Sequence, residues 1–210
     1  MTDAAVLARR ERALLCDEFE ALGPDAPTLC DGWLTRDLAA HLVVRESRPD
    51  AAAGMFVPAL KPHLDAVMRR TADSDWPTLV DRVRSGPPRV SPLRYAEGAA
   101  NLVEFVVHRE DVLRAQVPPR VADRSPAELD VVWQRLRASA PLFFRRDCVT
   151  VSCPGFGTWV SRAGVGAGSR VVVTGSPVDV LLLATGRPHL CALEGEDAAV
   201  AAFTARRRGI

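Results

Sequence analysis

A carboxylate and an imidazole stand four residues apart in the segment 101–111, at Glu104 and His108. If this segment is a helix, the two side chains project from the same face, with their Cβ atoms roughly 5–6 Å apart. A carboxylate oxygen and an imidazole nitrogen are both common ligands of divalent metals. The pair therefore indicates either part of a metal site or part of the solvated face of an amphipathic helix.

The same helix would carry more polar residues in line with this pair. At about 100° per residue, polar side chains at helical spacing fall in one narrow stripe with apolar residues on both sides. The stripe consists of Glu97, Asn101, Glu104, His108 and Asp111. A metal site on it needs a further ligand from another part of the chain, since structural and catalytic zinc sites have at least three protein ligands.

His41 is a candidate for that further ligand. It stands in a predicted helix, with Asp37 one turn before it and Arg45 one turn after it, and it projects on the apolar side. A lone histidine on such a face is commonly a core residue that is hydrogen-bonded to a neighbour, here Asp37. His41 becomes a candidate ligand because a metal site at Glu104 and His108 needs a third ligand from elsewhere in the chain.

The five cysteines are scattered and form no Cys-x-x-Cys pair, which argues against a zinc finger or a thioredoxin-type site. Reduced thiols in a cytosolic protein are the simplest interpretation. Cys30 precedes Trp33 in the loop before the helix of His41. It could act as a ligand or a nucleophile, although a lone cysteine beside apolar residues is more often a small buried hydrophobe.

Composition narrows the class of protein. Of the 210 residues, 48% are hydrophobic and 25% charged, as in ordinary globular proteins. The net charge of +1 gives no field that would attract nucleic acid or an anionic membrane. We find no signal peptide and no apolar run of roughly 20 residues, and we expect a cytoplasmic protein. Lys61 is the only lysine beside many arginines, a skew typical of GC-rich bacterial genomes.

The periodicity predicts an α+β protein. Four helical stretches separated by Gly and Pro, at 3–22, 36–45, 64–84 and from about 93–95 to 117, favour a four-helix bundle over residues 1–120. The third stretch is expected to be interrupted near 75–77. Thr35 is the expected N-cap of the second stretch and Ser125 that of a later helix. We expect a connecting helix and linker over 121–147, and a small α+β domain over 148–210 with strands at 149–152, 158–161, 170–174 and 189–193.

Three segments carry a resemblance to a known family: LCDGW at 29–33, RDLAAHL at 36–42 and VEFVVHRED at 103–111. They resemble the mycothiol-dependent maleylpyruvate isomerase family. The tail is similar as well, with TGSP at 174–177 and TGR at 185–187 in the expected places. The resemblance covers nearly the whole chain. It implies a DinB-like metal-binding four-helix domain followed by a small sterol-carrier-like domain.

The resemblance further implies a divalent metal, usually zinc, held by His41, Glu104 and His108. Three protein ligands leave a position open, as in catalytic sites. Asp37 and Asp111 are candidates to orient the two histidines, or are a cap and a surface charge.

A metal of this kind would serve a thiol-dependent isomerase or S-transferase that uses mycothiol or a similar small thiol and a small electrophilic substrate. An arginine could pair with substrate carboxylates. Arg45, Arg109 and Arg187 are the candidates. Two alternatives stay open: a non-catalytic metal- or ligand-binding protein on the same scaffold, and a plain structural bundle without a metal. The sequence does not indicate the oligomeric state.

Overall fold

The computed structural model describes residues 3–89, 91, 98, 101–161 and 170–206. The chain divides into two compact units, Ala5–Asp123 and Arg124–Ile210, the second of which also includes Met1–Ala4. The fold is α+β, as the sequence predicts, with helices in both units and one small sheet in the second. Among the helices of the described ranges, none is long and apolar enough to span a membrane.

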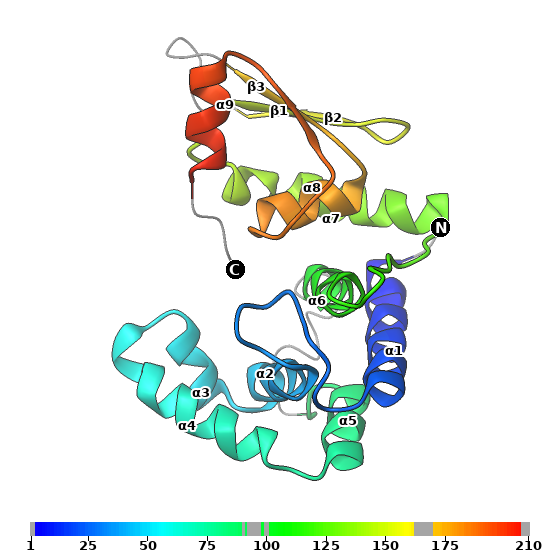
Figure 1. The fold of residues 1–210 in the computed structure, drawn as a ribbon, viewed down its shortest axis with the longest axis vertical. Helices are drawn as coiled ribbons and strands as arrows, with labels where there is room; N and C mark the ends of the chain where they lie inside the picture. Colours follow the sequence, from blue (N-terminus) through cyan, green and yellow to red (C-terminus); the bar gives the residue numbers. More distant parts are fainter. Residues whose placement is uncertain (1–2, 90, 92–97, 99–100, 162–169, 207–210) are drawn as a thin grey trace. The chain divides into compact units, whose positions relative to one another are not determined.

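The first unit is helical (Figure 1). Its elements, in chain order, are α1 (Ala4–Leu22), α2 (Thr35–Ser47), α3 (Pro49–Ala52), the 3-10 turns η1 (Ala53–Met55) and η2 (Pro58–Leu60), α4 (Lys61–Ala72), α5 (Trp76–Ser85) and α6 (Leu102–Arg114). The predicted stretch 64–84 is thus two helices. The Asp75 carboxylate accepts the Thr78 backbone N–H and caps α5, whose second residue is Pro77.

The main core of this unit is an apolar cluster shared by α1, α2, α5 and α6. Its large members are Leu15, Phe19, Leu38, Leu42, Leu79, Val83, Phe105 and Val112, all of them buried. In Figure 1, α3 and α4 lie on the side of α2 opposite to α1. There, Val44 of α2 packs with Ala51, Leu64 and Val67 in a second, smaller cluster. Burial on both sides fixes the position of α2, which carries His41.

The start of α2 differs from the prediction in one detail. Thr35 is the first helical residue and not the N-cap, which is Leu34. The Asp37 carboxylate accepts the backbone N–H of Leu34 at 3.0 Å, and Thr35 Oγ1 donates to the Gly23 carbonyl at 2.6 Å. Asp37, the third helical residue, therefore holds the backbone N–H of the N-cap residue, and the side chain of the N-cap residue itself caps no N–H. The predicted start of the last helix near 93–95, and Glu97 of the polar stripe, lie outside the described residues.

The second unit pairs helices with a four-stranded sheet. It contains α7 (Pro126–Phe143), β1 (Val149–Cys153), β2 (Gly157–Val160), β3 (Val171–Thr174), α8 (Pro177–Ala184), β4 (Ala192–Glu194) and α9 (Asp197–Thr204). The strand order is β2-β1-β3-β4; β1 and β3 are parallel and the outer strands antiparallel. The last strand starts three residues beyond the predicted start, because Ala192, Leu193 and Glu194 are the residues that pair with β3.

The core of this unit lies between the sheet and its helices; in Figure 1, α7 and α8 lie along one face of the sheet. Ser125 caps α7 as predicted, and Glu128 returns a hydrogen bond to its backbone N–H. Trp133 of α7 is 1% exposed. A Cβ at Gly157 would come within 3.3 Å of the Trp133 indole nitrogen, and the φ of +140° there also favours glycine.

Candidate metal centre

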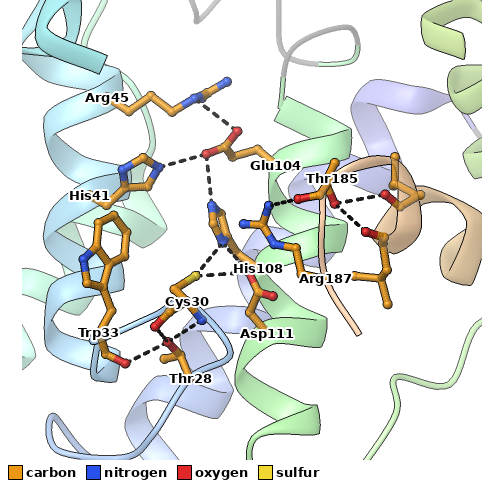
Figure 2. A network of polar contacts seen from close by, with 12 residues as sticks. Thr28, Cys30, Trp33, His41, Arg45, Glu104, His108, Asp111, Thr185 and Arg187 are labelled. Carbon is orange, nitrogen blue, oxygen red and sulfur yellow. Dashed lines mark hydrogen bonds and ion pairs between the residues drawn. The ribbon is translucent and has the colours of Figure 1, made fainter. Parts of the chain in front are cut away.

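Three predicted ligands from two helices come together inside the helical unit (Figure 2). His41 Nε2 of α2 lies 3.0 Å from Glu104 Oε1 of α6, and His108 Nε2 lies 3.2 Å from the same oxygen. One ligand atom from each residue falls within 4.8 Å of the other two. The structure therefore brings together His41, Glu104 and His108, although Glu104 and His108 follow His41 by 63 and 67 residues in the sequence.

These separations fit a small divalent ion. Zinc–nitrogen and zinc–oxygen bonds of about 2.0–2.1 Å imply about 3.3 Å between two tetrahedral ligands. The observed 3.0 and 3.2 Å between each histidine nitrogen and Glu104 Oε1 are close to that value. Two imidazoles and a carboxylate are also a ligand set that zinc commonly takes.

The polar stripe of α6 is buried and is not a solvated face. Asn101 and Asp111 are 0% exposed, His108 5% and Glu104 7%. Burial of ionisable groups is unfavourable unless they are paired or bind a metal. The interpretation of the stripe as an ordinary water-facing surface is therefore wrong for the residues that the structure describes.

Mutual contacts decide the protonation states of the cluster. Burial alone would raise the pKa of Glu104, but hydrogen bonds with His108 and His41 outweigh it and hold that pKa well below its usual value. Burial lowers the pKa of His41. Burial also acts to lower the pKa of His108, but its contacts with Asp111, Cys30 and Glu104 prevail and raise it well above the usual value. Glu104 is thus held as the anion that a cation needs.

The second nitrogen of His108 has its own partners. Nδ1 lies 2.9 Å from Asp111 Oδ2, and the Cys30 thiol donates to the same oxygen at 3.2 Å. A carboxylate on Nδ1 fixes the ring orientation and directs Nε2 toward the cluster. The expectation that Asp111 orients a histidine is confirmed. Asp37, the other candidate, bonds the backbone of Leu34 instead.

The loop before α2 covers one side of the cluster. The Trp33 ring packs against the His41 imidazole with centroids 5.2 Å apart and an interplanar angle of 47°. Figure 2 shows Cys30 from the same loop beside His108. The sequence offered Cys30 as a ligand or a nucleophile, with a buried hydrophobe as the commoner alternative, and gave Trp33 no role. The loop has no periodic pattern to reveal their neighbours, and the only signal was their place immediately before the helix of His41.

Arg45 is the predicted arginine that contacts the cluster within this unit. Its Nε lies 3.4 Å from Glu104 Oε2, and Nη1 donates to Asn101 Oδ1 at 2.8 Å. Asn101, one turn before Glu104 on α6, thereby fixes the guanidinium that holds the second oxygen of Glu104. The Asn101 Nδ2 atom is buried and has no hydrogen-bond partner among the residues that the structure describes.

The other two predicted arginines have different partners. Arg109 is 8% exposed, and its Nη1 donates to Glu11 of α1 at 3.3 Å. Arg187 belongs to the second unit, where Nη1 donates to the Thr185 carbonyl at 2.7 Å. A surface hollow of about 370 Å³ lies between α2 and α5, and none of the three cluster ligands lines it.

Comparison with known proteins supports the fold. No protein-family model matches the chain, and no curated protein matches it. Two solved structures do: mycothiol-dependent maleylpyruvate isomerase, and its H52A mutant. The TM-scores are 0.54 and 0.55, each at 12% sequence identity, and each alignment covers 93% of this chain and 96% of the other. The resemblance predicted from three short motifs is thus confirmed at the level of fold, over nearly the full length of the chain.

Proposed function

We propose that the helical unit holds a divalent cation, zinc, on His41, Glu104 and His108. The cation serves an isomerase or S-transferase in which a low-molecular-weight thiol such as mycothiol reacts with a small electrophilic substrate. The observation that carries the proposal is the convergence of two imidazole nitrogens on one oxygen of Glu104, at 3.0 and 3.2 Å. Three protein ligands leave a coordination position open for the thiol, as in catalytic zinc sites.

When bound, the cation would stabilise the thiolate form of the small thiol at neutral pH. The chain's own residues prepare the site for this role. Asp111 holds Nδ1 of His108, so that Nε2 is free for the cation. Arg45 holds Oε2 of Glu104, which leaves Oε1 facing the two imidazoles. Trp33 covers His41 and limits the access of water to it.

Arg45 is also the arginine that we propose for a substrate carboxylate. It is the predicted arginine in contact with the cluster, and its side chain is 15% exposed. The planar guanidinium suits bidentate recognition of a carboxylate. Arg109 is a weaker candidate, because it is buried against Glu11.

The structural neighbours support thiol dependence as a hypothesis. Their names give mycothiol as a requirement and maleylpyruvate as the compound isomerised. At 12% identity we extend to this chain the class of reaction and not the substrate.

Metal analysis of the purified protein tests the site. We expect His41→Ala and His108→Ala to lose the ion of this site and so to contain less metal than wild type and His63→Ala. His63 is a matched control, since it is a half-exposed histidine that contacts Asp50 on the surface. Circular dichroism establishes that each variant is folded. Equal metal content in all four proteins would disprove the ligand assignment.

A kinetic experiment tests the reaction. The metal-loaded protein is incubated with mycothiol and a small carboxylated electrophile, and thiol consumption or double-bond isomerisation is followed. We expect a rate that disappears after chelation and returns with zinc. A protein that binds the ion without any such rate would be the non-catalytic metal-binding protein named above as the alternative.

A further inference from the structure

A second set of metal-binding side chains lies on the other side of His108. Cys30, His108 and Asp111 each offer one donor atom, and these atoms all lie within 4.8 Å of one another. None of the contacts that define this set involves His41 or Glu104. We propose that Cys30, His108 and Asp111 form a second cation site, which takes a thiolate-binding divalent ion such as Zn²⁺ or Cd²⁺.

The distances fit such an ion. Bonds of about 2.3 Å to sulfur and about 2.0–2.2 Å to nitrogen or oxygen imply about 3.6 Å between the sulfur and either other ligand, and about 3.4 Å between those two. The observed separations are 3.8 Å for Cys30 Sγ to His108 Nδ1, 3.2 Å for Sγ to Asp111 Oδ2, and 2.9 Å for Nδ1 to Oδ2. Shifts of about half an ångström would admit the ion.

The loop that carries Cys30 is held in place by hydrogen bonds of its own. The Thr28 hydroxyl accepts the Cys30 backbone N–H and donates to the Trp33 carbonyl at 2.8 Å. The Leu29 backbone N–H donates to the carbonyl of Asp111 at 2.9 Å. The last bond joins the loop to the very residue of α6 that supplies the carboxylate. The cysteine is therefore positioned before any ion arrives, which reduces the entropy lost on binding.

The two proposed sites share a residue without sharing a donor atom. His108 directs Nε2 toward Glu104 and Nδ1 toward Asp111 and Cys30. An ion at the second site replaces the proton on Nδ1 and the proton of the thiol, and both protons are released to solvent. The imidazole ring would then bridge two ions. The second site does not require the first to be filled.

Cys30 differs in exposure from Cys16 and Cys153. Cys16 is fully buried and donates to the Val80 carbonyl, and Cys153 is 1% exposed in β1. Burial raises the pKa of both of these thiols to about 12. Cys30 is partly exposed, so an ion can reach it. Within the described ranges it is also the cysteine that belongs to a group of potential metal ligands.

A cadmium titration tests the proposal, because a thiolate bound to Cd²⁺ gives an ultraviolet charge-transfer band that imidazole and carboxylate ligands do not give. We expect wild type to bind two ions per chain and to show the band. Cys30→Ser, which is nearly isosteric, should bind one ion and lose the band. Asp111→Asn should weaken the second ion more than tenfold.

Two further variants separate this site from the first. His41→Ala should lose one ion but keep the band, because Cys30, His108 and Asp111 remain. Cys191→Ser replaces another partly exposed cysteine and should behave like wild type. A band that persists in Cys30→Ser, or an unchanged ion count in that variant, would overturn the second site and leave the proposed function intact. Loss of both ions in His41→Ala would show that the second site does not bind its ion independently of the first site.

Discussion

Two buried polar clusters of the helical unit are built on opposite plans. In one, Arg12 of α1 donates from both terminal nitrogens to the two oxygens of Glu46, each at 2.7 Å, and from Nη1 to the Val83 carbonyl at 2.9 Å. The guanidinium also lies 4.3 Å from the centroid of the Phe105 ring. Both terminal nitrogens thus meet carboxylate oxygens in the bidentate geometry that makes arginine–carboxylate pairs strong.

In the other cluster, the nitrogens of His41 and His108 converge on a single oxygen of Glu104. The second oxygen of Glu104 lies 3.4 Å from Arg45 Nε, a longer contact. Matched donors and acceptors link helices, whereas ligand atoms that converge on one point suit a cation. We infer that the Arg12–Glu46 pair serves stability and that the His41–Glu104–His108 cluster serves binding.

The largest effect expected from this comparison is on stability. Arg12→Met leaves the Glu46 carboxylate buried without its partner, and both side chains are at most 5% exposed. Removal of one member of a buried pair costs about 3–5 kcal/mol. We expect a loss of that size in urea denaturation, with an unchanged metal content per folded molecule.

The double variant Arg12→Met/Glu46→Met is the control, because replacing both members of a buried pair by apolar residues is often neutral. It should recover most of the loss. A single variant as stable as wild type would contradict the structural role of the pair, as would a single variant that loses metal while it remains folded.

The next effect is the stabilisation by the metal itself. An ion that binds only the folded chain, at a free concentration of 100 times its Kd, adds about 2.7 kcal/mol to the free energy of unfolding. We expect a chelator to lower the Tm of wild type and of His63→Ala. The Tm of His41→Ala should fall less than that of wild type, because this variant lacks the ion of the His41–Glu104–His108 site. A chelator response in His41→Ala equal to that of wild type would show that the ion binds elsewhere.

A smaller effect is expected from Asn101, which touches no ligand atom of the cluster but holds Arg45 at 2.8 Å. Asn101→Ala frees the guanidinium that restrains Glu104. Loss of such supporting contacts typically weakens metal binding about tenfold or more. Competition with a chromophoric chelator measures this change.

Gln116→Ala offers a matched control, since this amide bonds the Val112 carbonyl farther along α6. It should leave the metal affinity as in wild type. An unaltered affinity in Asn101→Ala would mean that Arg45 positions Glu104 without help.

Helical spacing was sufficient to predict one part of the site. Glu104 and His108 are separated by one turn, so any helix places them on one face, as observed. Spacing could not place His41 beside them, because that depends on which helices are neighbours; the family resemblance supplied this step. Spacing also could not show which of Arg45 and Arg109 contacts the cluster, since both stand on helices. Only tertiary packing shows that Arg109 contacts Glu11.

Much of the fold could likewise be predicted from the sequence, and the errors in that prediction have local causes. The break between α4 and α5 was visible because Asp75 and Pro77 are a cap and a first-turn proline. The N-cap of α2 was misassigned by one residue, because the helix already includes Thr35 and its N-cap, Leu34, has no capping side chain. The contacts of Cys30 were not predictable, because they depend on the path of a loop that Leu29 joins to Asp111.

The smallest expected effect concerns Cys16, which lies one turn after Arg12 and adjoins the structural pair. Its thiol is 0% exposed, and burial raises its pKa from 9.0 to about 12. Between these values the unfolded chain loses this proton and the folded chain retains it. Stability is therefore complete below pH 9 and falls as the pH rises toward 12. At pH 9.5 the loss from one such thiol is about 1 kcal/mol.

Cys153, whose pKa burial also raises to about 12, contributes equally to wild type and to Cys16→Ala, so its contribution cancels when the two proteins are compared. Urea denaturation at pH 7.5 and 9.5 should give a smaller difference for Cys16→Ala than for wild type, by about 1 kcal/mol. Comparing one protein at two pH values cancels the cavity that the substitution leaves. The same difference in both proteins would mean that Cys16 ionises in the folded state, and that the region around Arg12 is open to water. The assignment of the Arg12–Glu46 pair to a closed, structural cluster would then be wrong.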